Sequence, residues 1–251
     1  MIFSVKDFAI TACLFIFFGL TAAAADDYPY TQSYVILINN EIAGTETVAE
    51  TKGGSGEVIS TSEHELLVSN GMAMDRMIFS TRMVLSKGAK DIKTYVCQYK
   101  TGQAEGSITG NFGDSYEVSI QNGQITRILT RNGQSSEIKT PLTPNMVIVD
   151  FNVYHQYEYL VRRYDRKKKG TQTFANFIPV IGNDIPLKMT WLGDTTLSFD
   201  AKKLDVSTFR AEFTGIQNQT TTFSVDKNGR LAVLENPAQK LKVIRKDLNN
   251  F

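Results

Sequence analysis

The stretch that decides the fold is YEVSIQNGQITRILTRNGQSSEIK, residues 116–139. Polar and apolar side chains alternate through much of it, which is the two-residue period of a β-strand with one buried face. Asn122-Gly123 and Asn132-Gly133 divide the stretch at points ten residues apart. Asn-Gly is the strongest short hairpin signal, because both central residues of a type I′ turn need positive φ angles. The stretch therefore predicts three short antiparallel strands joined by two tight turns.

The β pattern continues on both sides of this meander. Residues 34–99 and 190–245 hold further β-rich runs, which are separated by turns containing Gly and Asn. A third hairpin signal, DKNG at 226–229, lies between two of the downstream runs. We expect about 11 or 12 strands, and their spacing with tight turns indicates a meander sheet, a sandwich or a barrel.

Residues 150–164 break the β pattern and predict one helix. Apolar side chains recur there every three or four residues and form a Tyr-rich stripe. The stripe consists of Val153, Tyr154, Tyr157, Leu160, Val161 and Tyr164. Asp150 is the expected N-cap, and the basic residues before Gly170 suit the helix end. Because a large sheet cannot leave its apolar side in water, we expect the helix on the concave face. The predicted fold is mainly β, with an antiparallel meander forming an open half-barrel around one central amphipathic helix.

Residues 1–25 have the pattern of a secretory signal. One lysine precedes an apolar run, and four alanines at 22–25 stand before the first acidic pair. The run is short for a membrane-spanning helix, which needs about 20 residues. We therefore expect cleavage after Ala25, a periplasmic or secreted location, and a single domain over residues 26–251. The alternatives are an uncleaved anchor and lipid attachment at Cys13, which lies inside the apolar run rather than after it.

The composition excludes several classes of protein. The 27 Lys and Arg nearly balance the 26 Asp and Glu, whereas a general nucleic-acid binder carries a basic excess, so we expect no nucleic-acid partner. The chain is 42% hydrophobic, which is too apolar for wholesale disorder. Two cysteines exclude a Cys-rich metal site, and two histidines exclude most all-histidine centres. After signal cleavage only Cys97 remains, and we interpret it as a buried small hydrophobe. We expect no cofactor, no metal and a monomer.

The two histidines are the first candidates for chemistry. His155 and Glu158 are neighbours on the predicted helix, so an acid–base pair or a two-ligand metal site is geometrically open to them. No third convergent group is identifiable from the sequence, so we favour a hydrogen bond on the helix surface. His64 stands between two glutamates in a strand, and those carboxylates point to the opposite face. We interpret His64 as solvated and assign no catalytic residue.

A methionine cluster is the second candidate feature. Met72, Met74, Met77 and Met83 lie close together in the sequence. Ordinary packing is the favoured interpretation, but Met also lines pockets that accept variable apolar ligands, and thioethers bind Cu(I). Our candidate lining of a ligand cavity consists of Val153, Tyr154, Tyr157, Leu160 and Val161 from the helix stripe, together with Met72, Met74 and Met77.

Basic residues at the end of the predicted helix form a third candidate surface. They are Arg162, Arg163, Arg166, Lys167, Lys168 and Lys169. Each charge near anionic headgroups contributes about 1 kcal/mol, so this run could contact a membrane or an envelope partner. A solvated helix end is the alternative, and we favour it.

Three features together carry a family resemblance. They are the GTET element at 44–47, the helix leading through Gly170 to the FIP at 177–179, and FSVDKNGRL at 223–231 followed by a last strand with Arg245. They resemble bacterial exported β-domains of unassigned function that share the half-barrel of the outer-membrane lipoprotein carriers (LolA/LolB-like). Similar domains precede some α/β-hydrolases. The resemblance implies an incomplete barrel that wraps around a helix and binds acyl chains in its concave cavity. No ligand-contacting residue of the carriers matches at motif level, so none is carried over.

These observations lead to one expectation and three rivals. The leading expectation is a non-enzymatic exported half-barrel that binds a lipid, an acyl chain, another amphiphile or a lipidated envelope protein. The first rival is a structural or interaction module of the cell envelope with a filled core. The second is a hydrolase built around His155 and Asp150, and the third is a Cu(I) carrier on the methionine cluster.

Overall fold

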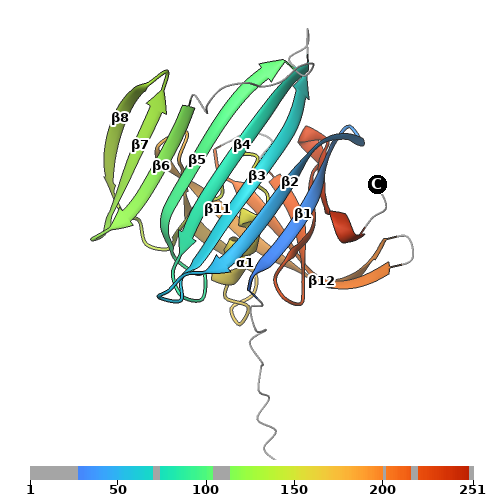
Figure 1. Cartoon of the computed structure of the whole chain (residues 1–251). Coiled ribbons are helices and arrows are strands. Elements are labelled where there is room, and N and C mark those ends of the chain that lie inside the picture. Colours follow the sequence, from blue (N-terminus) through green and yellow to red (C-terminus); the bar gives the residue numbers. More distant parts are fainter. Residues whose placement is uncertain (1–27, 70–73, 104–113, 200–201, 216–219, 249–251) are drawn as a thin grey trace, which may run out of the picture.

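The computed structural model describes residues 28–69, 74–103, 114–199, 202–215 and 220–248. These residues form one strongly curved 15-stranded sheet, whose two halves face each other across a single short helix, α1 (Figure 1). The fold predicted from the sequence, an open and mainly antiparallel half-barrel around one helix, is confirmed. The signal segment at 1–25 lies outside the described residues.

The strands of the sheet are joined mostly by short turns. Their bounds are β1 Tyr30–Ile38, β2 Glu41–Lys52, β3 Val58–Ser69, β4 Met74–Leu85, β5 Ile92–Gln103, β6 Asp114–Gln121, β7 Gln124–Arg131, β8 Gln134–Pro141, β9 Met146–Val147, β10 Thr171–Ile178, β11 Asn183–Phe199, β12 Lys202–Phe213, β13 Thr220–Asp226, β14 Leu231–Asn236 and β15 Leu241–Arg245. The helix α1 is Gln156–Arg163, and two 3-10 turns, η1 Pro237–Gln239 and η2 Lys246–Leu248, flank β15. The described part of the chain contains no helix that is long and apolar enough to span a membrane.

The order of the strands explains the open shape. The sheet runs β8-β7-β6-β5-β4-β3-β2-β1-β15-β14-β13-β12-β11-β10-β9, so β1 pairs with β15 in the middle. The two edge strands, β8 and β9, follow each other in the chain through residues 142–145. Only the pairing of β9 with β10 is parallel. The seam between the edges stays unpaired in the ladder, and Arg127 of β7 reaches across it to the carbonyl of Val180.

The meander at 116–139 forms as predicted. It corresponds to β6, β7 and β8 with their two hairpin turns. Asn122 and Gly123 have φ angles of 51° and 71°, and Asn132 and Gly133 have φ angles of 50° and 75°. These are the positive angles that a type I′ turn requires.

The sequence predicted too few strands and too long a helix. Residues 171–178 form β10, which the sequence pattern did not predict, because its last residues are buried on both faces and do not alternate. The helix begins only at Gln156, and His155 rather than Asp150 is its N-cap residue. Asp150 lies before a turn in which Asn152 has a φ angle of 62°, so the helix cannot extend back to it. The helix ends at Arg163, because the next residue, Tyr164, is extended.

The helix lies on the concave face, as predicted, and its buried side chains pack into two clusters. Most of them join the larger cluster, which reaches from β1 and β2 to β10–β15. Tyr159 points instead into the second cluster, which is built mainly from β3–β7. The helix therefore fills the space between the two halves of the sheet.

Candidate functional site

The register between β2 and β3 brings a carboxylate and an imidazole side by side. The two strands pair symmetrically about the loop at residue 55, so Glu46 lies directly opposite His64, and Glu50 lies opposite Ser60. All of these side chains point into the concave interior and are buried. Glu46 and His64 meet because directly opposite residues of an antiparallel pair point to the same face of the sheet. Glu50 and Ser60 lie on that face as well, because side chains an even number of residues apart in a strand share one face.

His155 completes this centre from the opposite side. Its Nδ1 lies 2.5 Å from Oε1 of Glu46, and Nε2 of His64 lies 3.3 Å from the same oxygen. Ser60 Oγ is 3.4 Å from Nε2 of His155, and Ser62 Oγ is 2.7 Å from Nε2 of His64. We call Glu46, His64 and His155 the histidine–glutamate centre. One ligand atom from each of the three residues lies within 4.8 Å of the others, so the centre could hold a metal ion.

Burial and charge set the protonation states of the centre. Burial raises the pKa of Glu46, but His64 and His155 outweigh it and hold this pKa below its ordinary value. Burial lowers the pKa of His155, but the Glu46 carboxylate outweighs it, so this pKa is raised. For His64 burial dominates and lowers the pKa to about 4. At neutral pH the metal-free centre therefore holds an ionised Glu46 and a neutral His64, and His155 holds its proton more strongly than a free imidazole does.

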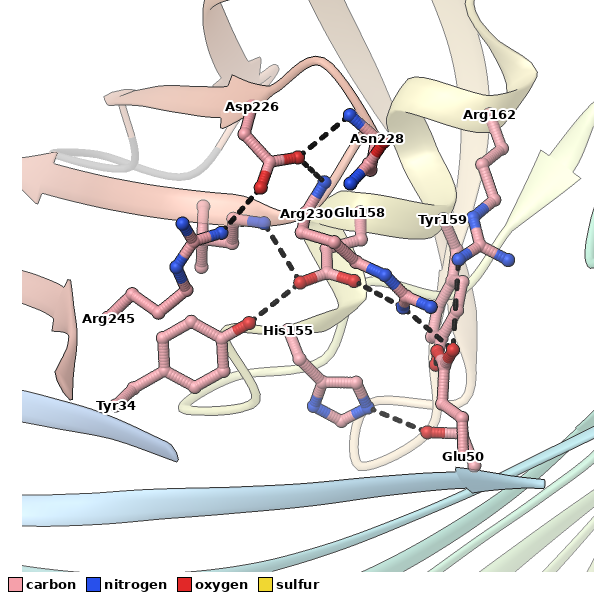
Figure 2. A network of polar contacts seen from close by, with 12 residues as sticks. Tyr34, Glu50, His155, Glu158, Tyr159, Arg162, Asp226, Asn228, Arg230 and Arg245 are labelled. Carbon is pink, nitrogen blue, oxygen red and sulfur yellow. Dashed lines mark hydrogen bonds and ion pairs between the residues drawn. The ribbon is translucent and has the colours of Figure 1, made fainter. Parts of the chain in front are cut away.

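A second network adjoins the centre and carries two more buried carboxylates. Figure 2 shows Arg230 pointing between Glu50 and Glu158, with Nη1 2.7 Å and 3.0 Å from their oxygens. Tyr159 donates to Glu50 over 2.6 Å, and Tyr34 donates to Glu158 over 2.7 Å. Burial disfavours the charged guanidinium of Arg230, but Glu158 and Glu50 outweigh it, so the pKa of Arg230 is raised. These ion pairs connect β2, the turn before β14 and α1 through the interior.

Asp150 belongs to a different network and does not pair with His155. Its Oδ2 accepts hydrogen bonds from Tyr95 (2.9 Å) and Tyr116 (2.5 Å). Burial raises the pKa of Asp150 against the effect of these hydrogen bonds. The neighbouring Cys97 is buried, as the sequence indicated, and burial raises the pKa of its thiol to about 12. The pair on which the hydrolase rival depended, His155 with Asp150, is therefore not formed.

The order Ser60, His155, Glu46 is that of a hydroxyl, imidazole and carboxylate relay. Such a relay activates a nucleophile only where a substrate carbonyl can reach the hydroxyl. Ser60 and His155 have 1% and 2% of their surface exposed. The buried position favours a structural role over acyl transfer.

The structure corrects both sequence interpretations of the histidines. His64 is 2% exposed, not solvated, because its strand buries a polar face. His155 does not form a surface hydrogen bond with Glu158, because it precedes the helix and turns toward β2. The missing third group was Glu46. The two strands and their loop at residue 55 were visible in the sequence, and extending that hairpin register would have placed Glu46 opposite His64.

The predicted cavity residues of the helix are all buried. Val153, Tyr154, Tyr157, Leu160 and Val161 are shielded from water, and the last four belong to the larger cluster. Met77 is half-buried and packs against the second cluster. Met74 is the first residue of β4. Met72 lies outside the described residues.

The basic run at the helix end divides into an inward part and an outward part. Arg162 turns inward, with Nη2 3.8 Å from Glu50, and Arg163 binds Asp91 over 2.5 Å. Four residues of the run are exposed, namely Arg166, Lys167, Lys168 and Lys169. The run is therefore not a uniform basic patch.

Comparisons with known proteins support the fold. No protein-family profile matches the sequence, and no curated protein matches it significantly. The chain is similar in structure to a β-barrel-like protein of the domain of unknown function DUF1849 from Brucella abortus, with a TM-score of 0.58 and 9% identity over 87% of this chain and 94% of that one. This chain has a β-barrel-like fold. A DUF1089 family protein from Pseudomonas aeruginosa aligns with a TM-score of 0.44 and 10% identity, over 75% of this chain and 92% of that one.

Replacing Arg230 by methionine should strongly destabilise the protein. The substitution leaves Glu50 and Glu158 buried with less compensating charge, and breaking a buried ion pair in this way costs about 3–5 kcal/mol. Urea unfolding followed by the fluorescence of Trp191, the only tryptophan of the chain, measures this free energy.

The matched control is Lys139→Met, which breaks the exposed ion pair with Glu137. An exposed pair contributes about 0–1 kcal/mol, so the midpoint should hardly move. Equal losses for the two variants would show that the buried network is not a main source of stability.

In a chelating buffer the stability should be greatest near pH 6.5, because the two histidines act in opposite directions. His64 has a folded pKa of about 4, so below about pH 6.5 the unfolded chain binds a proton that the folded chain does not. The stability of the protein therefore decreases as the pH is lowered from about 6.5 toward 4. His155 has a raised pKa, so above about pH 6.5 only the folded chain keeps the proton, and stability falls as pH rises. Unfolding free energies measured between pH 4 and pH 9 test this profile.

Two glutamine variants separate the two effects. His64→Gln should flatten the limb below about pH 6.5, and His155→Gln should flatten the limb above it. Wild-type and variant profiles that run parallel over the whole range would contradict the assignment.

Proposed function

We propose that this protein is an exported, non-enzymatic interaction module of the cell envelope, which contacts its partner through its outer surface. The observation that carries the proposal is the filled interior. The hollow beside α1, lined by residues including Tyr154, Tyr157 and Leu234, has a volume of about 50 Å³. Ligand pockets usually have volumes of about 300–1,000 Å³. Export is inferred from the signal pattern at residues 1–25.

An acyl chain in the concave space would have to displace the helix. Removing five buried apolar or aromatic side chains from the core would cost on the order of 10 kcal/mol, which is comparable to the whole stability of a typical domain. The ion pair of Arg230 with Glu158 would break as well, because Glu158 belongs to α1. A lipid-binding role like that of the carriers therefore has less support than a module with a filled core.

The outer face offers more room than the interior. Two hollows of about 620 Å³ and 430 Å³ lie over β2–β5 and share Thr47, Glu63 and Ser80. Short Thr, Ser and Ala side chains contribute to their lining, and the charged Arg82 and Lys100 border one hollow each. We call the two adjoining hollows together the outer hollow. It suits a polar partner better than an acyl chain, because its side chains offer hydroxyl and charged groups for hydrogen bonds.

The purified protein should carry no lipid. Native mass spectrometry of the chain, isolated from the envelope without detergent exchange, should show no adduct of lipid mass, and solvent extraction should yield no stoichiometric lipid. Leu160→Ala is the matched control, because it opens a cavity under the helix that an apolar dye can enter. One lipid per wild-type chain would contradict the filled-core proposal and favour the carrier-like one.

The outer hollow should be the contact surface. A photo-crosslinking residue in place of Thr61, which lines the larger hollow, should give one dominant cross-linked product in intact cells. The same residue in place of Lys188, exposed on β11, serves as the control and should give several-fold less. Equal yields at the two positions would contradict this placement.

A further inference from the structure

The chain has two histidines, and the fold brings both to one buried carboxylate. His64 and His155 are 91 positions apart in the sequence, yet both have a ring nitrogen within 3.3 Å of Oε1 of Glu46. His64 is among the residues that line the smaller outer hollow, but the side chains of all three residues are buried in the interior. Their meeting point therefore calls for a separate account.

The donor atoms have the chemistry and nearly the spacing of a metal site. Imidazole nitrogens with a carboxylate oxygen suit zinc and related divalent transition metals. Metal–ligand distances of about 2.0–2.2 Å in a tetrahedron place neighbouring donor atoms about 3.4 Å apart. The separation of 3.3 Å between Glu46 and His64 already fits this value. The 2.5 Å hydrogen bond from His155 would have to open by about 1 Å once its proton leaves.

Two buried atoms of the centre have no partner. Oε2 of Glu46 and Nδ1 of His64 are shielded from water and make no hydrogen bond among the described residues. A buried carboxylate oxygen without a donor is costly. A cation held between the two imidazoles would satisfy this carboxylate.

The charges of the surroundings point the same way. In the described network the carboxylates of Glu46, Glu50 and Glu158 are opposed by the guanidiniums of Arg162 and Arg230. Both arginines lie against Glu50 or Glu158, so Glu46 depends on positive charge held within the histidine–glutamate centre. Either a proton on His155 or a metal ion can supply it.

We propose that Glu46, His64 and His155 bind one divalent transition-metal ion of the zinc type. Glu46 supplies a carboxylate oxygen, and the two imidazoles supply one nitrogen each. The remaining position is open to a water molecule or to the second oxygen of Glu46. Because the three residues are buried, the ion enters before or during closure of the fold.

The ion would act as a structural clamp. Glu46 and His64 lie on β2 and β3, and His155 lies immediately before α1. A shared ion therefore fixes the start of the helix to the sheet. This inference is independent of the proposed interaction with an envelope partner, since a module with or without that partner can hold the ion.

Zinc titration of the full-length chain tests the proposal. The protein is freed of its affinity tag, unfolded with chelator present, and refolded at increasing concentrations of zinc sulfate. We expect one zinc per chain and, at a large excess of zinc over Kd, a rise in Tm of about 5–10 °C. In nitrogen-15 spectra of the imidazoles, the signals of both histidines should move together, with one zinc per chain completing the change.

Conservative variants identify the ligands. Glu46→Gln, His64→Gln and His155→Gln should each weaken zinc binding at least about 100-fold, because loss of a second-shell partner alone costs about 10–100-fold. Asp150→Asn is the matched control: it removes a buried carboxylate from the separate tyrosine network and should keep wild-type zinc affinity.

Three outcomes would overturn the assignment. They are a wild-type chain that refolds in the presence of zinc but takes up none, zinc affinity unchanged in the three variants, and a spectrum in which one histidine alone responds. Where a variant does not fold, the histidine spectrum of the wild-type chain decides by itself.

Discussion

A carboxylate with no access to water must find its positive charge inside the protein, and Glu46 is such a carboxylate, with 0% of its surface exposed. His155, which precedes the helix and has a raised pKa, can supply this charge, and His64 contacts the same carboxylate oxygen from the neighbouring strand. Arg230 does the same for Glu50 and Glu158 in the adjoining network. These contacts fix where α1 can lie, and the apolar clusters pack around it.

A half-barrel usually suggests a ligand-binding cavity, but here side chains of the helix and of the sheet fill the concave interior. An apolar helix stripe alone could move aside for an apolar ligand, because hydrophobic contacts have no preferred direction. Ion pairs and hydrogen bonds in a buried site do have a preferred direction, and losing one partner leaves a buried charge unpaired. The polar networks therefore make the helix a fixed part of the core, and this is why the outer surface is the better candidate for recognition.

The sequence predicted those parts of the fold that depend on local chemistry. Asn-Gly turns required positive φ angles and produced the hairpins of β6, β7 and β8, and the Tyr-rich stripe predicted the buried helix. The prediction from the sequence was wrong where the burial of side chains did not follow the alternating pattern of a half-buried strand. β10 was missed because both of its faces are buried near its end. His64 was interpreted as solvated because the two glutamates beside it point to the opposite face of the strand and no partner for its own face was visible nearby in the sequence.

The sequence by itself determined a mainly β chain with tight turns, one central helix and an export signal pattern, because each of these depends on residues close together in the chain. Only the tertiary structure decided that the concave space is filled and that Glu46, His64 and His155 meet. The physical reason is that the sheet curves through 15 described strands and brings the helix start over β2 and β3. No short-range pattern encodes a contact between residues 46 and 155, because it depends on the packing of the whole sheet around α1.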